Sequence, residues 1–123
     1  MSCECRGLDG LGLAICLAPP PGDYEVTADV GLGRTLVVNS EGAFLRASSR
    51  DDFLPFIRTQ EVRVSEETIA ALRVDVRGLV CEVIRALRDA AYHGSVVALE
   101  KLKRCQELVN EIEEGCVQGR KRL

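Results

Sequence analysis

The stretch from residue 44 to residue 63 concentrates aromatic rings and guanidinium groups in a short length of chain. Aromatic rings stack on unpaired bases and arginines pair with phosphates, so this combination is typical of surfaces that bind single-stranded nucleic acid. In the alternative interpretation the phenylalanines fill the core, as large apolar side chains usually do, while the acidic Asp51, Asp52 and Glu61 dilute the positive charge. The candidate nucleic-acid-binding residues are Phe44, Arg46, Arg50, Phe53, Phe56, Arg58 and Arg63.

Six cysteines form a second group of reactive side chains. Cys3 and Cys5 make one close pair, but a structural zinc site needs four ligands, usually from two such pairs, and the single histidine, His93, is distant in sequence. We therefore expect no metal and no cofactor, and we expect disulfides or buried thiols. A metal protein or small regulatory enzyme built around the N-terminal cysteines is the less favoured alternative. The expected disulfide joins Cys3 or Cys5 to Cys16 or to a helix cysteine, namely Cys81, Cys105 or Cys116.

No arrangement of catalytic residues stands out along the chain. Nucleophilic catalysis requires a nucleophile beside an oriented base, whereas His93 falls at a predicted helix end and Asp51-Asp52 falls in a loop. The Gly31-Leu32-Gly33 turn precedes a predicted strand and not the helix N-terminus that a dinucleotide site needs. The sequence therefore predicts a protein that is not an enzyme.

Four short alternating segments predict a sheet that would carry the candidate residues. In residues 24–30, apolar residues on one face alternate with charged or polar residues on the other, which is typical of a half-buried strand. Residues 34–38 and 43–47 are predicted as strands joined by a hairpin loop, in which Gly42 is available for a positive φ. Residues 60–64 are the fourth strand, and Pro55 predicts a loop or short helical turn over residues 53–58.

Helical periodicity dominates the second half of the chain. Apolar residues recur at a spacing of three and four from residue 69 to residue 90, and Ser65 is a good N-cap for them. We predict one long amphipathic helix from residue 65 to residue 92 or 93, ended by Gly94. Ser95 can then cap a second helix that reaches about residue 114. A single helix kinked at Gly94 is the alternative, but adjacent stop and start signals favour two helices.

The C-terminal helix carries a second apolar seam, which predicts assembly. The two helices present more apolar surface than one small sheet can cover, so a homo-oligomer, either a dimer or a tetramer, is expected. The chain is expected to divide into an α/β domain over residues 1–94 and an oligomerisation helix with a basic tail over residues 95–123. The predicted oligomer-interface residues are Leu99, Leu102, Cys105, Val109 and Ile112.

Composition limits the classes of partner and points to a hot habitat. The net charge is −3, so the chain lacks the broad basic surface of most duplex-DNA-binding domains. Arg outnumbers Lys 13 to 3, and Asn and Gln together number 5. These proportions favour a hyperthermophile, and hyperthermophilic archaea tolerate intracellular disulfides. The apolar run over residues 11–18 is too short to cross a membrane, so we expect a cytoplasmic protein with no membrane partner.

The predicted layout resembles the ThermoDBP-related single-stranded DNA-binding proteins of hyperthermophilic archaea. The resemblance covers the strands from Tyr24-Glu25-Val26 to Val62-Arg63-Val64 and the helical seams that start at Ile69 and Leu102. It implies a small α/β DNA-binding domain, with basic and apolar residues in a cleft, joined to C-terminal helices that drive oligomerisation.

The expected fold is α+β, with a small antiparallel sheet of three or four strands packed on a long amphipathic helix and followed by a C-terminal oligomerisation helix. The expected function is non-enzymatic, oligomeric binding of single-stranded DNA, or RNA, with little sequence preference. The alternative is a structural subunit or adaptor that assembles with another protein through its helices.

Overall fold

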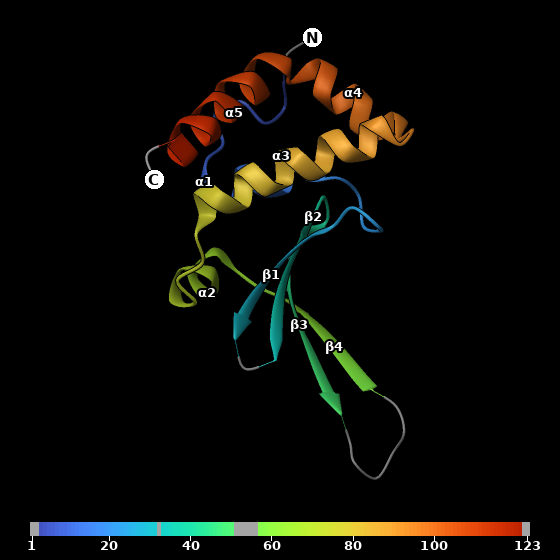
Figure 1. The fold of residues 1–123 in the computed structure, drawn as a ribbon. Coiled ribbons are helices and arrows are strands. Elements are labelled where there is room, and N and C mark those ends of the chain that lie inside the picture. Colours follow the sequence, from blue (N-terminus) through green and yellow to red (C-terminus); the bar gives the residue numbers. More distant parts are fainter. Residues whose placement is uncertain (1–2, 32, 51–56, 122–123) are drawn as a thin grey trace.

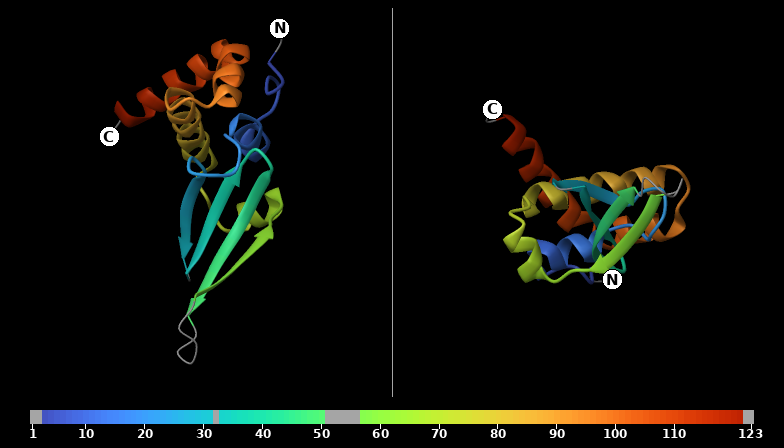
Figure 2. Two further views of the ribbon diagram at one scale, coloured as in Figure 1. Left: turned by 90° about the vertical axis from the view of Figure 1, so that its right-hand side faces the viewer. Right: turned by 90° about the horizontal axis from the view of Figure 1, so that it is seen from below.

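The computed structural model describes residues 3–31, 33–50 and 57–121, with the backbone alone for residues 48–50, 57–60 and 118–121. An antiparallel sheet of four strands meets a set of helices that gather at one of its ends (Figures 1 and 2). The predicted α+β class, with its antiparallel sheet, long helix and C-terminal helix, is confirmed. The described elements are α1 (Gly10–Leu17), β1 (Val26–Gly31), β2 (Arg34–Asn39), β3 (Gly42–Arg50), β4 (Ile57–Arg63), α2 (Glu66–Ala71), α3 (Val76–Tyr92), α4 (Val96–Arg104) and α5 (Gln106–Lys121).

The strands lie in the sheet in their sequence order, β1-β2-β3-β4. Between β2 and β3, Asn39 pairs with Gly42, whose φ of +147° confirms the predicted positive value. The Asn39 Oδ1 atom accepts a hydrogen bond of 2.8 Å from the backbone N–H of Glu41, which fixes this turn. Strand β4 begins at Ile57. Ile57 and Arg58, which were predicted to lie in a loop or helical turn, therefore have an extended backbone. Figure 2 shows the β3 and β4 strands running away from the helices.

One face of the sheet closes the core against α1 and α3. Side chains alternate between the two faces of a strand, and on this face the first three strands contribute buried or partly buried apolar residues to a cluster with residues of α1, α3 and α5. Because this cluster contains Val109 of α5, the core continues across the domain boundary expected at residue 94. The buried sheet residues of this face are Val26, Leu36, Val38 and Ala43.

Helix α1 is present in the structure but was not predicted from the sequence. It buries Leu11, Ala14 and Leu17, and it packs beside α3 with the sheet at its end (Figure 1). All eight of its residues are glycine or apolar. The helix therefore has no polar face, and the periodicity that reveals an amphipathic helix is missing.

The single long helix expected from residue 65 to residue 92 is wrong, because the chain breaks between α2 and α3. Ser65 does cap α2, since its side chain accepts from the Thr68 N–H. The chain then turns at Arg73, whose φ is +57°, and Asp75 caps α3 by accepting from the Gly78 N–H at 3.1 Å. A Cβ at residue 78 would lie 2.6 Å from the Asp75 carboxylate, so this cap requires a glycine there.

The expected C-terminal helix is also divided. Gly94, with a φ of +99°, ends α3 as predicted, and Ser95 caps α4 by accepting from the Ala98 N–H at 3.2 Å. Two helices therefore replace the alternative of one helix kinked at Gly94. A second break at Cys105 separates α4 from α5, so the helix predicted to run unbroken from residue 95 to about residue 114 is wrong.

Helix α5 returns along α3 and is fixed to it. Arg88 Nε donates to Glu113 Oε2 at 2.7 Å, and a disulfide joins Cys81 to Cys116.

Among the residues that the structure describes, no helix has both the length and the apolar character needed to cross a membrane.

Candidate nucleic-acid interface

The sheet face opposite the core carries the described part of the predicted interface. Val37 pairs with Thr27 on one side and with Phe44 on the other, and Phe44 pairs with Arg63 on β4. Arg46 lies two residues beyond Phe44 and therefore faces the same way. The structure thus brings together three of the predicted residues, Phe44, Arg46 and Arg63.

The Arg63 guanidinium lies over the Phe44 ring, with 5.3 Å between its central carbon and the ring centroid. This distance is typical of a cation–π contact. Gly42 lies beside the pair, since a Cβ there would be 3.2 Å from Arg63 Nη1. The missing side chain leaves room for the guanidinium, so Gly42, Phe44 and Arg63 form a platform with an aromatic ring and a positive charge.

Arg46 has acidic partners, which weaken its attraction for a phosphate. Its Nη2 atom lies 3.6 Å from Glu25 and 3.3 Å from Glu61. The Glu25 carboxylate also accepts from Asn39 Nδ2 at 2.8 Å, which fixes it beside Arg46. A bound phosphate must therefore compete with two carboxylates at Arg46, whereas the Arg63 guanidinium stacks on a neutral ring.

The part of the chain that the structure describes does not place the other four predicted residues in this group. Arg50 pairs with Ile57 and Arg58 pairs with Ser49 in the backbone register of β3 and β4. Their side chains lie outside the described part of the chain, as do Phe53 and Phe56 entirely. The interface prediction for these four positions stays a prediction.

The predicted oligomer seam lies largely inside the chain itself. Cys105 and Val109 are fully buried, and Leu102 and Ile112 pack against the same core. The side chains of Cys105 and Val109 therefore have no area left for a partner, because α5 folds back onto α3. Leu99 is 43% exposed, and Leu102 and Ile112 are only partly buried, so these three retain accessible surface.

An exposed apolar cluster around the α3–α4 junction was not expected. Tyr92 is 86% exposed, and Val96 and Val97 are also exposed. The sequence signal was present, since these residues flank His93-Gly94-Ser95, the stop and start of two helices. These apolar residues lie outside the two helical seams, so the sequence could have indicated that they would be exposed.

A groove between α1, α3 and α5 does not coincide with the interface. It has a volume of about 740 Å³, with Leu13 and Ile112 in its wall. Its charged lining consists of four carboxylates and one guanidinium, from Asp9, Asp75, Glu82, Glu111 and Arg77. Acidic side chains repel phosphate, so this groove is unsuited to nucleic acid.

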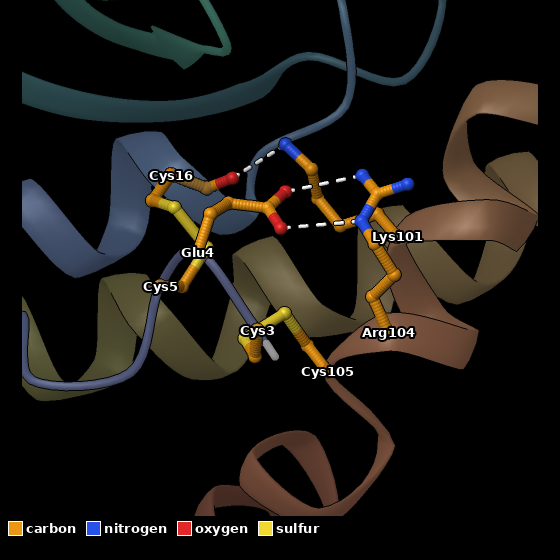
Figure 3. Close-up of polar contacts among 7 residues, drawn as sticks. All are labelled: Cys3, Glu4, Cys5, Cys16, Lys101, Arg104 and Cys105. Carbon is orange, nitrogen blue, oxygen red and sulfur yellow. Dashed lines mark hydrogen bonds and ion pairs between the residues drawn. A yellow bond between two sulfur atoms is a disulfide. The ribbon is translucent and has the colours of Figure 1, made fainter. Parts of the chain in front are cut away.

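The six cysteines form three disulfides, which confirms the expected disulfide bonding. Cys5 is joined to Cys16 and Cys3 to the helix cysteine Cys105, so both kinds of expected partner are used. These two disulfides lie near each other, where the N-terminal segment meets α1 and the end of α4 (Figure 3). The Sγ atoms of Cys3, Cys5 and Cys105 all lie within 4.8 Å of one another.

Three charged side chains surround this pair of disulfides (Figure 3). The Glu4 carboxylate accepts from Arg104 Nε at 3.2 Å and from Arg104 Nη2 at 3.1 Å. These hydrogen bonds lower the pKa of Glu4 and raise the pKa of Arg104. Lys101 Nζ donates to the Cys16 carbonyl oxygen at 2.6 Å, and burial lowers the pKa of Lys101.

Replacing Arg104 with glutamine should raise the pKa of Glu4 toward its ordinary value of 4.5. Because the folded-state pKa is lowered, the contact stabilises the fold at pH values above about 4.5, and this stabilisation is lost as the pH falls through the folded-state pKa. NMR titration of the Glu4 side chain measures the shift. Arg77→Gln, which makes the same charge change on α3, should leave the titration as it is. An Arg104→Gln titration identical to wild type would contradict the assignment.

None of the family models, curated proteins or solved structures compared with the chain matches it.

Proposed function

We propose that the protein binds single-stranded nucleic acid, DNA or RNA, with little sequence preference on the outer face of its sheet. The observation that carries the proposal is the Arg63 guanidinium placed over the Phe44 ring, on the sheet face opposite the main core cluster. An aromatic ring beside a fixed cation suits an unpaired base and its phosphate. The layout shared with the ThermoDBP-related proteins is a further reason for the proposal, as is the expected cytoplasmic location.

The charges around the platform predict how such binding would work. In the proposed complex, a base stacks beside Phe44 while its phosphate pairs with Arg63. A second phosphate displaces Glu25 or Glu61 from Arg46. Each displaced carboxylate reduces the net gain from that contact. We therefore propose modest affinity per nucleotide, with stacking contributing about 1–3 kcal/mol per base. A duplex hides its base faces, so single strands should bind more tightly.

Fluorescence anisotropy with a labelled oligo-dT at several salt concentrations tests the proposal. Phosphate contacts release counterions, so the affinity should fall steeply as the salt concentration rises. A duplex of the same length serves as the competitor. Absence of binding to a long oligo-dT at low salt would reject the proposal and favour the protein-assembly alternative.

Replacing Arg63 with glutamine should weaken oligo-dT binding and reduce the slope of log affinity against log salt by about 1, because one phosphate contact is lost. Arg77→Gln makes the same charge change on α3 and should leave the slope unchanged. Phe44→Leu keeps an apolar side chain but removes the ring, and it should cost about 1–3 kcal/mol of binding free energy. Equal slopes for the two arginine variants would exclude the platform as the binding site.

A second candidate function, assembly through the helices, is favoured by the exposed apolar cluster of Tyr92, Val96 and Val97. Contiguous exposed apolar side chains are often interaction sites. The expected partner is a second copy of the chain. Light scattering distinguishes the states, since one chain has a mass of 13.4 kDa.

A further inference from the structure

Two of the three disulfides meet in one place, and their sulfur atoms are the soft ligands that zinc prefers. The Sγ atoms of Cys3, Cys5 and Cys105 lie within 4.8 Å of one another, and Cys16 is bonded to Cys5. We propose that Cys3, Cys5, Cys16 and Cys105, once reduced, bind one zinc ion as a four-thiolate site. Disulfide and zinc are then two alternative cross-links of the same four residues.

The spacing of the sulfur atoms suits this exchange. A tetrahedral site with Zn–S bonds of about 2.3 Å places its sulfur atoms roughly 3.8 Å apart. The Cys5 sulfur lies within 4.8 Å of the Cys3 and Cys105 sulfurs, so it needs to approach them by about 1 Å or less. The bonded pairs, Cys3–Cys105 and Cys5–Cys16, must separate by roughly 2 Å once they are reduced. Side-chain rotation supplies movements of this size.

The four ligands come from three segments that the fold holds together. Cys3 and Cys5 lie in the N-terminal turns, Cys16 lies in α1, and Cys105 lies at the break between α4 and α5 (Figure 3). The Cα atoms of Cys3 and Cys105 are 4.8 Å apart, and those of Cys5 and Cys16 are 5.7 Å apart. The backbone therefore already has the spacing that the four ligands require.

The surrounding charges favour a negatively charged cluster. Zinc with four thiolates carries a net charge of −2, and a buried charge needs neighbouring charges of the opposite sign. Cys5 and Cys105 are fully buried. Lys101 donates to the Cys16 carbonyl oxygen, and Arg104 lies beside the same N-terminal turn, where it binds the Glu4 carboxylate.

The redox step balances with a dithiol as the reductant. Two dithiol molecules supply four electrons and four protons, both protein disulfides become four thiols, and each dithiol becomes a disulfide. Zinc then displaces the four thiol protons, which are released to solvent. The third disulfide, Cys81–Cys116, is the internal control, because reducing it provides only two ligands at a separate position.

The test uses the full chain, reduced with dithiothreitol and desalted without oxygen. Cobalt(II) is titrated first because its thiolate complexes absorb visible light, and zinc is then added to displace it. We expect one metal ion per chain, with the absorption bands of tetrahedral cobalt–thiolate. The control Cys81→Ser/Cys116→Ser should bind in the same way. The variant Cys3→Ala/Cys105→Ala should bind more than about 100-fold more weakly, since it loses two ligands, whereas loss of a residue that only hydrogen-bonds a ligand costs about 10–100-fold.

If reduction loosens the fold, circular dichroism provides a second measurement of zinc binding. Zinc should then restore the helical signal of the reduced wild type and of the Cys81→Ser/Cys116→Ser control. Absence of a cobalt–thiolate band in the reduced wild type would overturn the proposal, whether the chain is folded or not. Equal metal affinity for the two double variants would overturn it as well, because a non-specific thiol pair would then account for the binding.

Discussion

Replacing both Cys3 and Cys105 with alanine should lower the free energy of unfolding by about 4–5 kcal/mol. The disulfide between them joins residues 102 positions apart. A cross-link restricts the unfolded chain more strongly when the loop that it closes is longer. Alanine is the suitable replacement because Cys105 is buried among apolar side chains, where a serine hydroxyl would lack a partner. Denaturant unfolding without reductant, with the remaining disulfides verified by mass spectrometry, measures the loss.

The matched control is Cys5→Ala/Cys16→Ala, which removes a disulfide from the same cluster. This bond spans only 11 residues, so its removal should cost about 3 kcal/mol or less. Equal losses for the two double variants would show that local packing, and not the length of the closed loop, determines the contribution of each bond.

Val109→Asp should lower the free energy of unfolding by about 4 kcal/mol or more, or prevent folding altogether. Val109 is 0% exposed and lies in the main core cluster, so a carboxylate there would be buried with no basic partner provided by the core. Circular dichroism during denaturant unfolding measures the effect.

Val117→Asp is the control on the same helix. Val117 is 53% exposed, so the same substitution should change stability by about 0.5 kcal/mol. The pair of variants also tests the assembly prediction for α5. A Val109→Asp protein that stays folded while its mass falls to the 13.4 kDa of one chain would mean that this seam joins two chains. We expect unfolding instead.

Features that depend on neighbouring residues were predictable from the sequence. The alternation that begins at Val26 gives a strand whether or not the rest of the fold is known. Gly42 and Gly94 adopt positive φ values because a turn and a helix end require them. Ser65 and Ser95 cap helices through their own side chains. All of these features arise within a few residues of chain, which is the range that sequence patterns describe.

Features that depend on distant residues were not predictable. Glu25, which directly precedes β1, places its carboxylate beside Arg46 only because the strands pair. Six cysteines allow fifteen pairings, so spacing alone could not select Cys3–Cys105. The break at Arg73 also goes against its sequence, since apolar residues continue the helical spacing through it. There the cap at Asp75 and the packing of α3 outweigh local helix propensity.

Synthesis of the chain imposes an order on its cross-links. Cys5 and Cys16 both leave the ribosome early and can pair while most of the protein is still unmade, because their bond spans 11 residues. Cys3 must wait until Cys105 has been translated, and Cys81 must wait for Cys116. Cys3 is available at the same early stage and competes for Cys16. Once a local bond has removed Cys5 and Cys16 from the competing thiols, the four remaining cysteines allow only three pairings, whereas six allow fifteen.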